Sequence, residues 1–91
     1  MKIKVNYLGP LLAASGIENQ AFELPEGATT FDVIDAVVEA HPEMAAALRG
    51  ASGGPAGGML MVIDAEAVSR TQPTPVADGD EVTLMPAIGG G

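Results

Sequence analysis

The sequence predicts an α+β domain in which one main helix packs on one face of a mixed β-sheet. Short segments with the two-residue period of strands lie on both sides of a single segment with the 3.6-residue period of a helix. One long helix cannot cover both faces of a sheet, so the second face remains open. With 91 residues, the chain is long enough for one domain and too short for two.

The first two predicted strands are joined by a short connection, which favours antiparallel pairing. Apolar and polar side chains alternate strictly over residues 2–8. Gly9-Pro10 ends this strand, because proline has no amide hydrogen for the ladder. Residues 11–14 follow as a loop or a single helical turn, and residues 18–24 form the second strand.

The main helix is predicted over Thr30–Ala40, with Thr29 or Thr30 as its cap, because a threonine hydroxyl can accept an unpaired amide hydrogen there. Pro42 ends the helix, since the residue before a proline disfavours the α conformation, and a short second helix follows over residues 43–48. One face of the main helix carries an apolar stripe: Phe31, Ile34, Val37 and Val38.

Three more strands are predicted in the C-terminal half. The continuous apolar run Met59–Ile63 is typical of a buried central strand, and Glu66–Val68 of a short edge strand. The turn Asp78-Gly79-Asp80 leads into the last strand, Glu81–Met85, which Pro86 ends. The glycine-rich segment 50–58 is interpreted as a loop, because it lacks the Lys-Ser/Thr pair of a phosphate-binding loop.

Alternation along these strands divides the apolar residues into core and surface. The predicted core consists of Val5, Phe31, Ile34, Val38, Leu60, Val62, Val82 and Leu84. The residues expected on the sheet face away from the helix are Met59, Met61, Ile63 and Met85. Methionine adapts to many contacts, and exposed apolar area usually marks an interface. We therefore predict a partner interface formed by Met59, Met61, Met85, Pro86 and Ile88.

The composition excludes several classes of function. There is no cysteine, and His41 is the only histidine, so neither a thiolate or zinc site nor a serine triad can be assembled. The formal net charge of −8 argues against nucleic acid and against an anionic membrane as partners. No apolar run approaches the roughly 18 residues that span a bilayer, and the N-terminus has no secretion signal, so we expect a cytoplasmic protein.

The chain ends in residues 87–91, which we interpret as a flexible glycine tail that follows a domain of residues 1–86. Gly89, Gly90 and Gly91 contribute nothing to a fold, but they make a chain thin enough for a narrow channel in a partner. The carboxylate of Gly91 is ionised at neutral pH and must be activated before it can donate an acyl group. Because the chain has no nucleotide-binding motif, a partner enzyme has to perform that activation.

The run Val76–Gly91, VADGDEVTLMPAIGGG, is similar to the C-terminus of the MoaD/ThiS family of ubiquitin-like sulfur carriers. The outline of the whole chain fits as well, from the opening hairpin to the terminal glycines. The resemblance implies a β-grasp fold, in which the first and last strands are parallel neighbours. It also implies that an E1-like enzyme adenylates Gly91 with ATP, and that sulfur then replaces AMP to give a thiocarboxylate.

Within this family, the chain most resembles the small subunit of molybdopterin synthase, which donates sulfur to a pterin precursor held by the large subunit. The chain would then be non-catalytic alone and would bind no cofactor itself. Two features depart from the usual pattern. Three glycines stand where two suffice, which leaves Gly89 as a spacer, and Val62-Ile63-Asp64 lacks the asparagine common in relatives. The long loop 50–58 favours the molybdopterin type.

Three other functions stay open at this point. A carrier with the same chemistry could supply sulfur for thiamin thiazole or another thiolated product. A ubiquitin-like modifier would join the carboxylate of Gly91 to lysines of other proteins. A plain interaction domain would have an inert tail, and the glycines at 89–91 argue against it.

Overall fold

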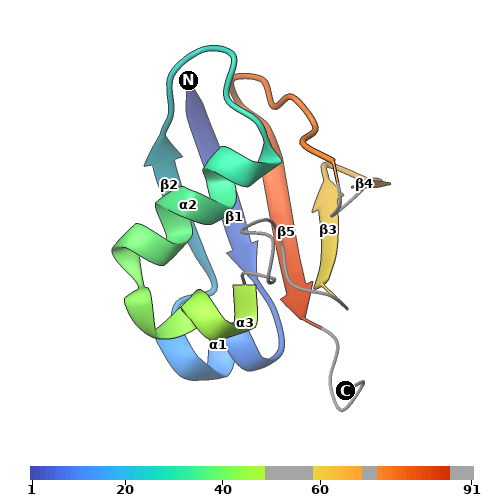
Figure 1. Ribbon diagram of the computed structural model, residues 1–91. Coiled ribbons are helices and arrows are strands. Elements are labelled where there is room, and N and C mark those ends of the chain that lie inside the picture. The colour runs from blue at the N-terminus through green and yellow to red at the C-terminus, as the bar shows by residue number, and fades with distance from the viewer. Residues whose placement is uncertain (49–58, 69–71, 87–91) are drawn as a thin grey trace.

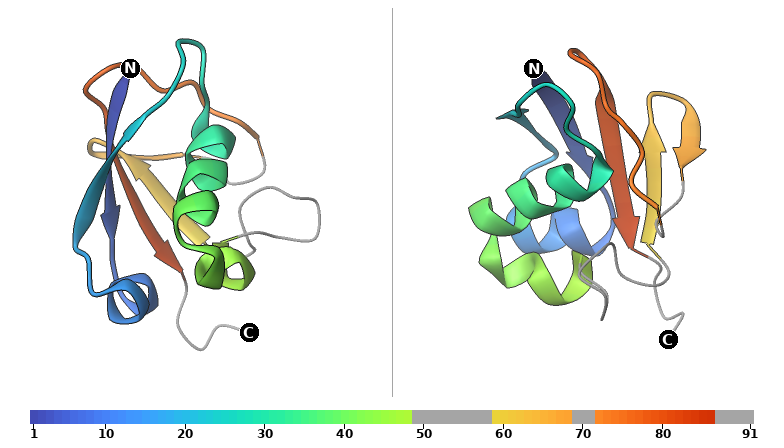
Figure 2. Two further views of the ribbon diagram at one scale, coloured as in Figure 1. Left: turned by 90° about the vertical axis from the view of Figure 1, so that its left-hand side faces the viewer. Right: turned by 45° about the horizontal axis from the view of Figure 1, so that its top comes forward.

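The computed structural model describes residues 1–48, 59–68 and 72–86 of the chain. Within these residues, five strands form one mixed sheet, and the helix α2 crosses one of its faces (Figures 1 and 2). The strands are β1 (Lys2–Tyr7), β2 (Asn19–Glu23), β3 (Met59–Ile63), β4 (Glu66–Val68) and β5 (Glu81–Pro86). Their order in the sheet is β2-β1-β5-β3-β4.

The pairing of the strands confirms the predicted topology. β1 and β5 are parallel neighbours, whereas the pairs β1–β2, β3–β5 and β3–β4 are antiparallel. A parallel pair needs a long crossover connection, and the chain passes through α2 (Thr30–Ala40) on its way from one side of the sheet to the other. Pro86 is the last residue of β5 and not, as expected, the residue that follows it.

The core lies between α2 and the sheet. The register places Val5 opposite Val82 and Tyr7 opposite Leu84, and all four side chains are fully buried. Residues directly opposite each other in a ladder share a face, so these two pairs form the floor on which α2 packs. The other strongly buried residues include Ile3, Leu11, Met44, Leu48 and Met61.

The buried face of α2 differs from the predicted stripe. Its buried residues are Thr30, Val33, Ile34 and Val37, whereas Phe31 and Val38 are only half-buried. The first turn explains the difference, because Thr30 is held inward by the segment before β5. Its N–H donates to the carbonyl of Thr74 at 2.9 Å, and its Oγ1 accepts the N–H of Thr74 at 3.1 Å.

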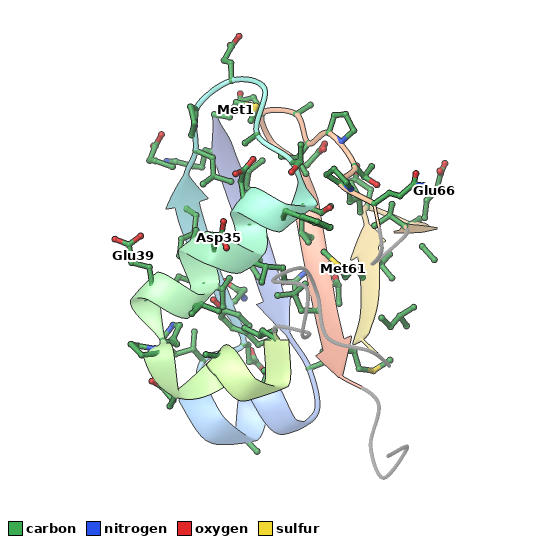
Figure 3. All side chains as sticks on the ribbon, in the orientation of Figure 1. Met1, Asp35, Glu39, Met61 and Glu66 are labelled. Carbon is green, nitrogen blue, oxygen red and sulfur yellow. The ribbon has the colours of Figure 1, made fainter. Side chains whose placement is uncertain are left out.

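The orientation of β3 is the reverse of the prediction. Met61 is fully buried (Figure 3), Leu60 is 42% exposed, and Val62 is half-buried. The cause is the register with β5, which sets Met61 opposite the buried Leu84 and Leu60 opposite the exposed Met85. The expectation that Met61 belongs to an exposed interface is therefore wrong, as is the placing of Leu60 in the core.

The ends of α2 follow their sequence signals. The Thr29 hydroxyl accepts the N–H of Phe31 at 3.2 Å, and the Asp32 carboxylate accepts the N–H of Thr29 at 2.8 Å. This reciprocal arrangement is a capping box, which satisfies amide groups that the helix itself cannot pair. At the other end, the N–H of His41 donates to the carbonyl of Val37 at 2.8 Å, which confirms His41 as a boundary residue.

The short helices lie in the connection between β1 and β2 and in the connection between α2 and β3. Residues 11–14, expected as a loop or one helical turn, are part of α1 (Pro10–Ser15). The predicted helix over 43–48 is a 3-10 turn at Pro42–Met44 followed by α3 (Ala45–Leu48). None of the helices in these described ranges is long and apolar enough to cross a membrane.

Candidate functional site

The strand β5 ends at Pro86, the last described residue before residues 87–91 of the sequence. It lies in the interior of the sheet and pairs with β1 on one side and with β3 on the other, so its direction is held from both sides (Figure 1). Its last residue is Pro86, and residues 87–91 follow it in the sequence. The predicted site residues Ile88, Gly89, Gly90 and Gly91 lie outside the described residues.

The start of β5 is held by the carboxylates of the Asp-Gly-Asp turn. Asp78 Oδ1 accepts the N–H of Lys2 at 2.7 Å, and Asp80 Oδ2 accepts the N–H of Ala77 at 2.8 Å. Gly79 has a φ of 87°, which a residue with a side chain rarely adopts, and its N–H donates to the carbonyl of Lys2 at 2.9 Å. Asp78 therefore fixes the turn against β1, Asp80 closes the turn itself, and both act as structural residues.

The end of β5 carries an exposed apolar surface on the sheet face opposite α2. Leu8, Leu60 and Met85, which together we call the apolar surface, are 40%, 42% and 38% exposed. Leu60 and Met85 face each other in the β3–β5 register. The N–H of Leu8 donates to the carbonyl of Leu84 at 3.2 Å, which extends the β1–β5 ladder and sets Leu8 beside Met85. These side chains therefore lie beside the end of β5, the strand that precedes residues 87–91 in the sequence.

The other half of this face is polar. The Nζ of Lys4 lies 3.9 Å from the Glu81 carboxylate, and both side chains are about half exposed. The Asn6 amide donates to Glu81 Oε1 at 2.8 Å and to the Thr83 hydroxyl at 3.2 Å. Charge and hydrogen bonding therefore occupy the start of β5, and apolar side chains occupy its end. An exposed ion pair of this kind adds little to stability, typically below about 1 kcal/mol.

A shallow groove lies beside the end of β1 and the connection from β1 to β2. It has a volume of about 310 Å³ and is lined by residues that include Asn6, Leu8, Leu12 and Thr83. In the described ranges, no group of three or more His, Cys, Asp or Glu side chains is arranged to hold a metal ion. The geometry of this face suits contact with another protein better than enclosure of a small cofactor.

The predicted interface is therefore corrected in part. Met85 is exposed on the expected face, and its role in binding a partner stays a prediction. Leu60 was missed, because a continuous apolar run does not reveal which residues face the helix. Pairing of β3 with β5 could have identified Leu60, because residues directly opposite each other in a ladder share a face. Leu60 lies opposite Met85, which points outward. The side chains of Met59 and Pro86 lie outside the described part.

Comparison with known proteins extends this picture to the whole chain. The model of the ThiS family matches residues 5–91. The chain belongs to the ThiS family. It is thus a member of the MoaD/ThiS group of ubiquitin-like sulfur carriers with the β-grasp fold, as the run Val76–Gly91 predicted.

Three similar proteins illustrate the range of this family. The molybdopterin synthase sulfur carrier subunit of Chlamydomonas reinhardtii is 30% identical over 91 residues, which cover all of both chains. The crystal structure of SAMP1 from Haloferax volcanii, a small archaeal modifier protein, has a TM-score of 0.87 and 25% identity over all of both chains. The structure of the Amycolatopsis orientalis BexX/CysO complex contains a chain with a TM-score of 0.72 and 28% identity, covering 98% of this chain and 99% of that one.

Proposed function

We propose that this ThiS-family protein carries sulfur as a thiocarboxylate on Gly91 and donates it as the small subunit of molybdopterin synthase. The observation that carries the proposal is the end-to-end match with the Chlamydomonas molybdopterin synthase sulfur carrier subunit. The match extends through the glycines, so that Gly91 stands where that chain ends. The exposed apolar surface beside the end of β5 supports it, because the tail has to be delivered by a docked domain.

The chemistry of the proposal requires a partner at both stages. The carboxylate of Gly91 attacks the α-phosphate of ATP, which forms an acyl-adenylate and releases pyrophosphate. A sulfide then adds to the acyl carbon and AMP leaves, so the product is a thiocarboxylate and no oxidant or reductant is consumed. An E1-like enzyme catalyses this activation, and the large subunit of molybdopterin synthase then holds the pterin precursor that receives the sulfur.

The domain's own part in this chemistry is to position the tail. The β5 strand, paired on both sides, directs the chain, and the apolar surface contacts the partner. Glycine at 90 and 91 lets the extended backbone enter a channel that excludes a Cβ atom. The enclosed channel also keeps water away from the activated acyl group.

The experiment is mass spectrometry of the intact protein after incubation with the activating enzyme, ATP and sulfide. The wild-type chain should gain the mass that corresponds to replacing one oxygen with one sulfur. We expect no gain after deletion of Gly91, after Gly90→Ala, or after addition of one residue at the C-terminus. Each variant should keep the thermal midpoint of the wild type, because residues 87–91 lie beyond the core-forming strands. Sulfur gain by the Gly91 deletion would contradict the proposal.

A second candidate function is protein modification, which the similarity to the Haloferax small archaeal modifier protein favours. In that case, the activated Gly91 would form an isopeptide bond with a lysine of another protein. The two functions separate in one experiment. The thiocarboxylated protein is mixed with the molybdopterin synthase large subunit and the pterin precursor. In parallel, the unmodified protein is incubated with the activating enzyme, ATP and a lysate, so that a lysine amine can attack the acyl-adenylate and release AMP. Product formation in the first mixture supports the sulfur donor, and Gly91-linked lysines in the second support the modifier.

A further inference from the structure

The strand β2 offers a second surface, at the edge of the sheet. In the part of the chain that the structure describes, β2 pairs with β1 alone (Figure 1). The carbonyl of Glu18 accepts the N–H of Tyr7 at 2.9 Å, and the N–H of Leu24 donates to the carbonyl of Met1 at 2.9 Å. Because bonding alternates along an antiparallel ladder, the even-numbered residues bond to β1. The backbone groups that point outward belong to Asn19, Ala21 and Glu23.

An acidic groove adjoins the end of this edge, between α2 and residues 24–28, which follow β2. It has a volume of about 330 Å³, and Leu24 and Ala36 contribute apolar surface to it. The carboxylates that line it come from Glu26, Asp32, Asp35 and Glu39. Figure 3 shows Asp35 and Glu39 along α2, with Glu39 projecting on the side of β2. A chain that added to the edge of β2 would therefore run beside a row of negative charges.

The carboxylates of this groove determine what kind of strand can pair with the edge of β2. Unpaired strand edges bind other strands through their backbone groups, and a second copy of this protein would be one possible occupant. Two such edges would bring two acidic grooves together, in molecules that each carry a net charge of −8. Repulsion disfavours that pairing. A strand with basic side chains has the complementary charge.

We propose that the β2 edge binds an extended segment of a partner protein that carries lysine or arginine at every second position. Its backbone pairs with the outward N–H and C=O groups of Asn19, Ala21 and Glu23. Alternate side chains then lie on the helix side of the sheet, next to Phe22. Their aliphatic stems cover the apolar surface of Leu24 and Ala36, and their cationic ends reach the carboxylate of Glu39 and its neighbours.

This surface is separate from the end of β5 and from the apolar surface. β1 lies between β2 and β5, so the edge is about 10 Å or more from the strand that leads to Gly91. A partner bound at β2 could hold the protein while the tail occupies another enzyme. The proposal does not depend on the sulfur chemistry, and it can be tested on the unmodified protein.

The test uses a synthetic peptide that alternates threonine and lysine over the length of β2, with a threonine–glutamate peptide as control. Amide hydrogen exchange of the full-length protein is followed by NMR. With the lysine peptide, exchange of the outward amides of Ala21 and Glu23 should slow by about tenfold or more. No protection with the lysine peptide, or equal protection with the glutamate peptide, would overturn the proposal.

Three variants locate the binding surface. Glu39→Arg should weaken binding of the lysine peptide by about tenfold, whereas Glu66→Arg makes the same charge change at the opposite edge (Figure 3) and should leave affinity within about twofold. Ala21→Pro removes an outward amide but keeps the bonds to β1, and it should abolish protection. Equal weakening by the two arginine variants would mean a general charge effect, and the proposal would fail.

Discussion

Tyr7 is buried at the end of β1, and its hydroxyl donates a hydrogen bond to Oε1 of Gln20 at 3.1 Å. The same oxygen lies 2.8 Å from Nε2 of His41, whose ring packs against that of Tyr7 in a T-shaped arrangement with a centroid distance of 5.9 Å. Burial raises the pKa of Tyr7 to about 12. A single glutamine oxygen thus links β1, β2 and the end of α2, and it does so only while the phenol keeps its proton.

This raised pKa predicts a loss of stability in strong alkali. In the unfolded chain the phenol loses its proton near its ordinary pKa of 10.0, whereas in the folded protein it keeps the proton up to about 12. The stability that comes from the protonated Tyr7 phenol is therefore fully present below pH 10. It is lost as the pH rises through about 12. The loss should be about 2–3 kcal/mol, because each pKa unit corresponds to about 1.4 kcal/mol. Urea unfolding across this range should show it in the wild type and not in Tyr7→Phe, and equal losses would contradict it.

At the scale of the elements, local signals predicted where helices and strands begin and end. The Thr29 cap, Pro42 and the Asp-Gly-Asp turn each act on the backbone beside them, so they can be recognised in the sequence alone. Which face of a helix or strand is buried could not be predicted in the same way, because it is decided by contacts with residues far away in the sequence. The register with β5 sets which residues of β3 are buried, and Thr74 sets the buried face of α2.

For the candidate site too, the local features could be predicted from the sequence and the long-range ones could not. The run Val76–Gly91 indicated the family and the tail, since both depend on consecutive residues. The surface beside the end of β5 was predictable only where one strand alternates clearly, as at Met85. In the apolar run Met59–Ile63 both faces carry large apolar side chains, so alternation gives no sign of direction. That is why Met61 was placed outside and Leu60 inside.

The orientation of β3 predicts opposite effects for two neighbouring substitutions. Met61→Ala removes a fully buried side chain and should lower the free energy of unfolding by about 2–4 kcal/mol. Leu60→Ala shortens a side chain that is 42% exposed and should cost about 1 kcal/mol or less. Urea unfolding of the two variants measures both values. A larger loss for Leu60→Ala would mean that β3 presents its other face to the core.

The whole molecule is strongly acidic, and its charges are unevenly placed. The chain has twelve acidic residues, and its only lysines, Lys2 and Lys4, are exposed on β1 on the face opposite α2. A net charge of −8 attracts basic partner surfaces over long range and speeds their encounter. We expect the apolar surface of Leu8, Leu60 and Met85 to provide most of the short-range contact with a partner, since these are the large hydrophobic side chains exposed in the described residues.

A charge placed on the apolar surface should weaken binding to a partner and leave the fold intact. Met85→Asp places a charge at the centre of this surface, where a partner would have to strip it of water, and should weaken binding to the molybdopterin synthase large subunit by about tenfold or more.

Ala21→Asp is the matched control, because it adds the same charge at an exposed position of the same face on β2. Long-range attraction changes equally in both variants, so only contact at Met85 can separate them. Titration calorimetry measures both affinities, with thermal melts to check folding. Equal affinities for the two variants would remove Met85 from the interface and leave charge as the main source of binding.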